Sequence, residues 1–164
     1  MRADFDLNSF LPYRLNRATE FVSLGFAALY RDRYGMTRPE WRTLAALGAN
    51  SRMTATEIGI HSSMHKTKVS RAVRALEKRR WLKRSENEAD RRVEHLELTD
   101  LGIRHYRELV ELARGYEKVL SGLLGEDGLS KLEAGLAAAE KAIAASARRT
   151  RGRKAAIRGD VSGN

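Results

Sequence analysis

A run of cations and hydroxyls between His65 and Arg80 has the spacing needed to read DNA. Val69, Val73 and Leu76 recur at intervals of four and three residues, which places them on one stripe of a helix. The opposite side of that helix carries Thr67, Arg71, Arg74 and Lys78. Three neighbouring residues are also expected to contact DNA: Lys66, Lys68 and Ser70. Arginine can donate to O6 and N7 of one guanine, and hydroxyls can donate or accept at base edges. The segment therefore predicts a recognition helix in a major groove; a merely solvated charged surface is the alternative.

The residues before this helix predict a helix-turn-helix. Thr54 and Glu57 have the spacing of a capping box, which starts a short helix. The following segment, residues 61–64, contains two serines, and serine favours turns because its hydroxyl competes for backbone hydrogen bonds. A second helix over about residues 65–80 then completes the motif.

Two short strands with a polar loop follow the recognition helix. Residues 81–85 and 93–98 are expected as strands, and the second alternates apolar and polar side chains. The loop between them carries Asp90, Arg91 and Arg92. An arginine on such a hairpin can enter a narrow minor groove while the helix lies in the major groove. The segment over about residues 84–93 is therefore expected to act as a wing.

Four phrases in order resemble the multiple antibiotic resistance regulator (MarR) family of bacterial transcription factors. They are residues 35–47 (GMT followed by WRTLAAL), residues 67–77 (TKVSR leading to LE), Asp90-Arg91-Arg92, and Leu98-Thr99 leading to Gly102. The resemblance covers roughly residues 7–147. It implies a homodimer that binds inverted-repeat operators and usually represses until a small molecule or oxidant is sensed. Two departures stand out: Arg80 replaces a common glycine, and Gly59 replaces a helix-forming alanine.

Charge is concentrated where this motif lies. The chain has a net charge of +10. Residues 52–92 carry 12 basic and 5 acidic side chains, and residues 148–164 carry 6 and 1, whereas residues 93–147 carry 6 and 10. A uniformly basic surface would not be polarised in this way, so a polyanionic partner is indicated.

Long amphipathic helices flank the motif. A helix over about residues 8–34 has an apolar stripe made of Leu11, Leu15, Ala18, Val22, Gly25 and Leu29. Later stripes cover residues 106–123 and 129–143, with a break expected at Gly125 and Gly128. These stripes exceed what one small winged unit can cover. The predicted fold is therefore mainly α: a winged helix-turn-helix (about 37–99) with long N- and C-terminal helices (about 8–34 and 100–147) forming an interleaved dimerisation bundle. A monomeric helical domain is the alternative.

The expected organisation is one domain over residues 1–147 and a basic disordered tail over residues 148–164. The tail has few large apolar side chains, and its cations could follow phosphates outside the operator or only aid solubility. No apolar run is long enough to span a membrane, and no secretory signal is seen, so a cytoplasmic protein is expected.

A candidate effector site lies at the start of the first helix. Tyr13, Arg14 and Arg17, together with Trp41, could hold an aromatic or aliphatic carboxylate, since a guanidinium matches a carboxylate bidentately. The resemblance places an effector between the dimer helices and the winged domain. The alternative is that Arg14 and Arg17 pair with acidic C-terminal helices of a partner chain.

Other chemistry is poorly supported. His61 and His65 are four residues apart, but the predicted turn separates them, so no metal site is expected. The absence of cysteine excludes disulfides and thiol-based oxidation sensing. No nucleophile motif or phosphate loop is present, so neither an enzyme nor a cofactor is expected. The sequence thus predicts a dimeric, ligand-responsive regulator of double-stranded DNA, with a small aromatic or carboxylate effector. A non-specific architectural or RNA-associated basic protein is the rival interpretation.

Overall fold

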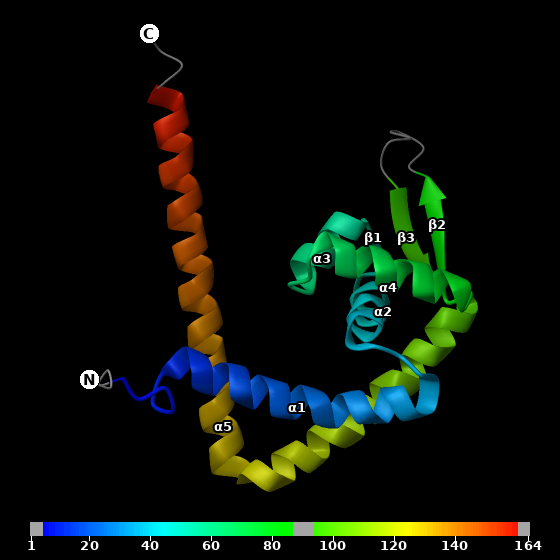
Figure 1. The fold of residues 1–164 in the computed structure, drawn as a ribbon, viewed down its shortest axis with the longest axis horizontal. Helices are drawn as coiled ribbons and strands as arrows, with labels where there is room; N and C mark the ends of the chain where they lie inside the picture. The colour runs from blue at the N-terminus through cyan, green and yellow to red at the C-terminus, as the bar shows by residue number, and fades with distance from the viewer. Residues whose placement is uncertain (1–4, 87–93, 161–164) are drawn as a thin grey trace. The chain divides into compact units, whose positions relative to one another are not determined.

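The order of elements is that of a winged helix-turn-helix between two long helices (Figure 1). A computed structural model of the chain describes residues 5–86 and 94–160, without the side chains of residues 86 and 147–160. The helices are α1 (Leu11–Tyr34), α2 (Arg38–Asn50), α3 (Ala55–His61), α4 (Lys66–Lys78) and α5 (Asp100–Asp160). The strands are β1 (Arg52–Met53), β2 (Leu82–Glu86) and β3 (Glu94–Leu98). The mainly helical winged fold predicted from the sequence is confirmed.

The chain divides into two compact units, Met1–Tyr116 and Glu117–Asn164. The first unit holds α1 to α4, the sheet and the beginning of α5. The sequence predicts a single domain over residues 1–147. A second copy would be needed to join the terminal helices into that domain, so the single domain stays a prediction.

The sequence predicts a helix stop at Gly35 and a helix start at Thr54, and both are found. Gly35 ends α1 in the left-handed region, with φ of 60°. Thr54 and Glu57 form the expected capping box: the Thr54 N–H donates to Glu57 Oε2 at 2.7 Å, and the Glu57 N–H donates to Thr54 Oγ1 at 3.2 Å. The sequence predicts that Gly48 and Asn50 end the next helix; α2 runs through Gly48 and ends at Asn50. The reason is packing, because a Cβ at Gly48 would lie 2.4 Å from the Tyr106 ring.

The sheet is antiparallel, with strand order β1-β3-β2. Strand β2 pairs with β3 along its whole length, with Leu82 opposite Leu98 and Arg84 opposite Leu96. Strand β1 adds only two pairs, from Arg52 and Met53 to β3. The sequence does not predict β1, since two residues are too few to show alternation.

The core of the first unit joins the helix-turn-helix to both long helices, α1 and α5. Among its fully buried side chains are Leu44, Leu47, Ile58, Leu76, Leu96 and Leu109. Tyr116 packs on α1 so closely that a Cβ at Gly25 would lie 2.4 Å from its hydroxyl, which donates to the Val22 carbonyl at 2.8 Å. The stripe of α5 up to Tyr116 is therefore covered within the chain. A second copy that covers the remaining stripes stays a prediction.

Helix α5 extends further than the sequence predicts. Gly125, with φ of 68° and ψ of 168°, interrupts it as expected, whereas Gly128 is helical. Beyond that break the backbone is helical to Asp160, which differs from the disordered tail expected from residue 148. Alanine, arginine and lysine dominate residues 147–158, and these residues have high helix propensity.

The corner between α4 and the wing uses a left-handed arginine. The Trp81 N–H donates to the Leu76 carbonyl at 3.0 Å, and the Arg80 N–H donates to the Glu77 carbonyl at 2.8 Å. This is a Schellman motif, in which the left-handed residue is usually glycine. Here it is Arg80, with φ of 60°, so the departure from the family pattern leaves strain of about 1–2 kcal/mol at this turn.

Hydrogen bonds from the residue that caps α5 stabilise this corner. Thr99, which the sequence predicts as the cap of the long helix after the wing, donates from Oγ1 to the Arg80 carbonyl at 2.7 Å and accepts from the Gly102 N–H at 3.1 Å. The Thr99 N–H donates to the Trp81 carbonyl at 3.0 Å. A Cβ at Gly102 would lie 2.0 Å from that same carbonyl oxygen. Only glycine fits this position without moving the backbone of the corner.

Replacing Gly102 by alanine is therefore expected to destabilise the protein by about 1–3 kcal/mol or more, because the clash is with backbone. Urea unfolding followed by circular dichroism measures it. The matched control is Gly115→Ala in the same helix, where a Cβ would meet nothing within 4 Å. That variant should gain roughly 0.5–1 kcal/mol from helix propensity. Equal midpoints for the Gly102 variant and the parent would refute the packing argument.

Candidate DNA interface

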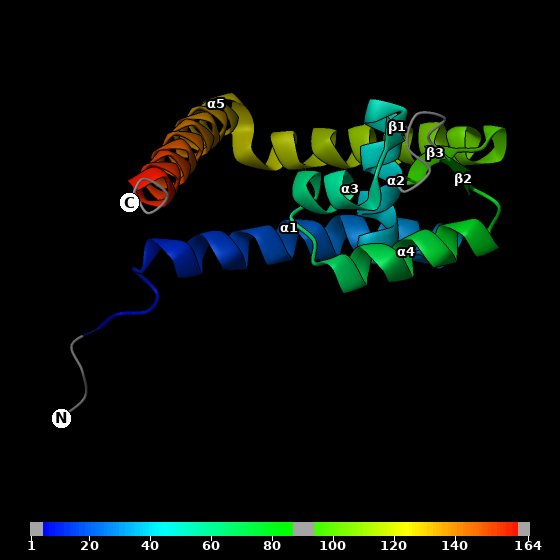
Figure 2. The ribbon, with the colours of Figure 1, turned by 90° about the horizontal axis from the view of Figure 1, so that it is seen from above.

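Helix α4 buries one side and exposes the other. Val69, Ala72, Val73 and Leu76 are all 3% exposed or less. This stripe faces the core, with α2, α3 and the β2–β3 hairpin nearby (Figures 1 and 2). Every residue predicted from the sequence to contact DNA on α4 is exposed; they are Lys66, Thr67, Lys68, Ser70, Arg71, Arg74 and Lys78.

The exposed cations of α4 have no acidic partners among the side chains that the structure describes. Among the described side chains, no carboxylate forms an ion pair with any of Lys66, Lys68, Arg71, Arg74 or Lys78. Glu77 is the one acid in the α4 sequence, and it is taken by Arg84. The face is thus a row of uncompensated positive charge on a rigid helix, which suits binding of a polyanion.

The wing stands beside this helix. The hairpin of β2 and β3 follows the corner at Trp81, as expected. The predicted wing contacts Asp90, Arg91 and Arg92 lie outside the described residues, and their role stays a prediction.

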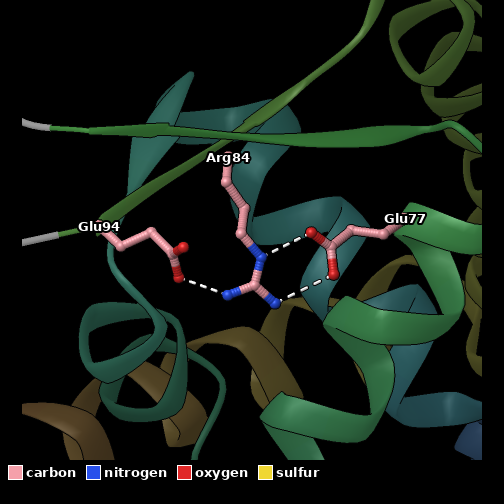
Figure 3. Close-up of polar contacts among 3 residues, drawn as sticks. All are labelled: Glu77, Arg84 and Glu94. Carbon is pink, nitrogen blue, oxygen red and sulfur yellow. Dashed lines mark hydrogen bonds and ion pairs between the residues drawn. The ribbon is translucent and has the colours of Figure 1, made fainter.

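Arg84 of β2 joins the wing to α4 (Figure 3). Its Nε donates to Glu77 Oε1 at 2.6 Å, and its Nη2 donates to Glu77 Oε2 at 3.0 Å. Its Nη1 donates to Glu94 Oε2 on β3. The hydrogen bonds to Glu77, and then to Glu94, raise the pKa of Arg84 above its ordinary value. Sequence reasoning missed this group, because its members lie on three elements with no common periodicity.

Arg79 ties the end of α4 to the end of α1. Its Nη1 donates to the Tyr34 carbonyl at 2.7 Å, and its Nη2 donates to the Gly35 carbonyl at 3.1 Å. Its guanidinium also lies 3.7 Å from Glu40 Oε2 and 5.4 Å from the centre of the Trp81 ring. A cation at the carbonyl end of a helix is favourable. The ends of these two helices are therefore held together by one side chain, which the sequence did not reveal.

A second tie at this corner links α1 with α5. The Tyr34 hydroxyl donates to Glu108, and this hydrogen bond is the main reason that the pKa of Glu108 lies below its ordinary value. His105 lies 3.5 Å from the same carboxylate and stacks on Trp81, with ring centres 4.3 Å apart. The corner of the wing thus rests on both long helices of the first unit.

The predicted effector residues do not meet within one chain. Trp41 packs against Phe26 and Tyr30. Arg17 lies over the rings of Tyr13 and Phe21, and Arg14 is exposed. Tyr30 lies 13 positions after Arg17 along the helix, a rise of about 20 Å. The site made of Tyr13, Arg14, Arg17 and Trp41 therefore stays a prediction that would require a second chain.

A cavity of about 470 Å³ lies between α1 and the start of α2. Its lining includes Ala27, Tyr30 and Met36 as apolar walls, with Arg38 and Glu20 as charged groups. Arg38 Nη1 donates to Glu20 Oε2 at 3.1 Å. Burial raises the pKa of the Tyr30 phenol above its ordinary value. An aromatic wall beside an arginine is suited to an organic acid.

Other sites were sought in the described part of the chain. His61 ends α3 and His65 is the N-cap of α4, so the turn separates them as predicted. The described residues contain no cluster of three or more histidine or acidic side chains that could hold a metal. None of the described helices is long and apolar enough to cross a membrane.

Comparisons with known proteins agree with this geometry. Residues 34–93 match the model of the MarR family. A MarR family transcriptional regulator from Silicibacter pomeroyi DSS-3 is 28% identical, with a TM-score of 0.73 over 85% of this chain and 99% of that chain. Another regulator from Silicibacter pomeroyi is also 28% identical, with a TM-score of 0.68 over 79% of this chain and 87% of that chain. Among curated proteins, no sequence matches that of this chain.

Two solved structures with bound ligands share the fold. NadR in complex with 4-hydroxyphenylacetate is 20% identical, with a TM-score of 0.67 over 84% of this chain and 94% of that chain. PcaV from Streptomyces coelicolor, in complex with its natural ligand, is 21% identical, with a TM-score of 0.67 over 82% of this chain and 94% of that chain. The sequence predicts a likeness to the MarR family of transcriptional regulators. The comparisons confirm this likeness, in sequence over residues 34–93 and in fold.

Proposed function

We propose that the chain is a sequence-specific, double-stranded DNA-binding repressor that acts as a homodimer on an inverted repeat and is released by a small aromatic acid. The observation that carries this proposal is the face of α4. Its cations are exposed and unpaired with any described acid, while its apolar side is buried. On this proposal α4 lies in the major groove and the wing in the adjoining minor groove.

The second copy is proposed because α1 leaves apolar side chains uncovered. Its outward stripe includes Leu11, Leu15, Phe21, Val22 and Leu24, which are between 43% and 67% exposed. The unit formed by residues 117–164 also has exposed apolar side chains, among them Leu132, Leu136 and Ile143. Two chains that cover these stripes against each other would form the interleaved bundle.

Selection from a pool of random duplexes tests the proposed DNA specificity. The expected result is enrichment of one inverted repeat whose half-sites lie about one helical turn apart, since a two-fold protein requires a two-fold site. An architectural or RNA-associated protein would enrich no sequence, because its binding is electrostatic. Equal affinity for selected and unselected pools would therefore refute the proposal.

An aromatic acid is proposed as effector because two proteins of this fold bind ligands, 4-hydroxyphenylacetate in one case. The cavity between α1 and α2 could hold such a ring against Ala27 and Met36, with its carboxylate replacing Glu20 on Arg38. The cavity also adjoins Gly35, whose carbonyl is held by Arg79 of α4. An acid that binds there can shift DNA affinity only if it favours one placement of α4 over another.

Arg38→Ala is expected to raise the acid concentration needed for half-release of DNA by roughly ten-fold or more, the usual effect of losing a charge-assisted hydrogen bond. Benzoate, salicylate and 4-hydroxyphenylacetate are suitable probes, titrated against the operator complex by fluorescence anisotropy. Arg14→Ala and Arg17→Ala are the matched variants, and both should respond like the parent. A loss of response confined to these two variants would move the effector to the sequence-predicted site at Tyr13, Arg14, Arg17 and Trp41.

A further inference from the structure

The described part of the hairpin narrows from three strands to two. Strand β1 reaches only Leu96 and Glu97 of β3, so the described segment beyond Arg84, which pairs Ser85 with His95 and Glu86 with Glu94, is a two-stranded ribbon. Leu82 and Leu96 are buried, at 4% and 1% exposure, and they attach the base of the hairpin to the core. An isolated two-stranded ribbon is marginally stable in water. Its direction must therefore be set by contacts at the point where it leaves the core.

Arg84 lies at this point, on the same face of β2 as Leu82. Its guanidinium takes both oxygens of Glu77 on α4 and one oxygen of Glu94 on β3 (Figure 3). The three side chains are 29–50% exposed, so these pairs add little to folding stability. A bidentate contact nevertheless restricts the angle between its partners, which a single point charge would not do.

We infer that Arg84 is a positioning residue for DNA recognition: it fixes the wing relative to α4 and neutralises two carboxylates beside the DNA-binding face. This inference rests on the proposed function. Arg84 is not assigned a phosphate contact, because its donors are already directed to Glu77 and Glu94. Its removal would release the wing and leave both acids facing a polyanion.

Arg84→Ala is expected to lower operator affinity roughly ten-fold, within the range of about 5- to 150-fold for loss of a direct base contact, with folding unchanged. Arg84→Lys should lose nearly as much, because an ammonium cannot span both oxygens of Glu77. The proposed wing should favour A·T-rich flanks, where the minor groove is narrow, and this preference should weaken as well, since it depends on where the wing enters the groove. Lys83→Ala is the matched control. It removes another cation from β2, and this cation forms its ion pair with Glu97 of β3.

A double-mutant cycle separates positioning from a phosphate contact. In a Glu77→Ala background, Arg84→Ala should cost less than about three-fold, because the tie to α4 is already lost. A phosphate contact would instead keep its full effect in that background, and it would reduce the salt slope by about one. That result, or full affinity in Arg84→Lys, would overturn the inference.

Hydrogen exchange of the DNA-free protein tests the tie independently of the proposed function. Arg84→Ala should speed exchange of amides in residues 84–86 and 94–96, while the amides of α4 remain protected. Unchanged exchange in the hairpin would overturn the inference even if operator binding is confirmed. Absence of sequence preference in the parent protein would refute the proposed function instead.

Discussion

Replacing Leu15 and Val22 by glutamate is expected to convert the proposed dimer to a monomer in solution. Both side chains lie on the uncovered stripe of α1, at 48% and 43% exposure. Burying a glutamate in place of each would forfeit about 1.5–3 kcal/mol of apolar burial and add the cost of desolvating a charge. The dissociation constant of the dimer should therefore rise at least ~100-fold. Sedimentation velocity over a concentration series measures it.

Operator affinity should fall with the dimer. A monomer that reads one half-site loses the gain from linking two sites, which is on the order of 10²–10⁴-fold. Ile60→Glu is the control, since Ile60 is 76% exposed but lies on α3, outside the stripe. That control should sediment as the parent does. Dimers that persist in the double variant would show that the α1 stripe is not the interface.

Arg71→Ala and Arg74→Ala are expected to weaken operator binding by about 1–3 kcal/mol each, roughly 5- to 150-fold. Both guanidiniums project from a helix whose opposite side is anchored in the core, so loss of either should leave folding unchanged. Base preference should relax only at the positions that the missing side chain reads. Competition with single-base variants of the operator measures both effects.

Two comparisons make this result specific. Arg107→Ala removes an exposed cation from α5, away from α4, and it should change affinity by less than about three-fold. If Arg71→Ala weakens binding to operator and random duplex equally, Arg71 contacts only phosphate. If neither variant affects binding, α4 is not the recognition helix.

Local signals explain why much of the fold could be predicted from the sequence. The capping box at Thr54, the left-handed stop at Gly35 and the apolar stripe of α4 each depend on neighbouring residues only. The exposed face of α4 follows from the same periodicity, so the predicted placement of Arg71 and Arg74 was correct.

Contacts between distant residues explain what could not be predicted. Gly48 has the sequence character of a helix stop, but in the structure it lies inside α2 because the Tyr106 ring packs against it. The sequence gives no sign that Gly102 lies against the Trp81 carbonyl. The hydrogen bonds of Arg84 and Arg79 likewise join different elements. Arg84 links β2 to α4, and Arg79 links the end of α4 to the end of α1.

The residues of the candidate effector site lie apart within one chain for a geometric reason. They were grouped because the family resemblance places an effector between the dimer helices and the winged domain, with Tyr13, Arg14 and Arg17 at the start of the first helix and Trp41 on the next helix. In the structure α1 is a 24-residue helix, and Trp41 packs beside Phe26 and Tyr30, several turns beyond Arg17. Helix length thus separates residues that sequence order suggests are neighbours.

Competition between the selected inverted repeat and a scrambled duplex of equal length and composition tests the central claim most directly. The protein should be present as a dimer, at physiological salt, because electrostatic binding dominates at low salt. We expect a preference for the repeat of at least ~10³-fold, the range of specific DNA-binding proteins. A preference below about ten-fold, with affinity that depends only on salt, would contradict a sequence-specific regulator and identify α4 as a general polyanion-binding surface.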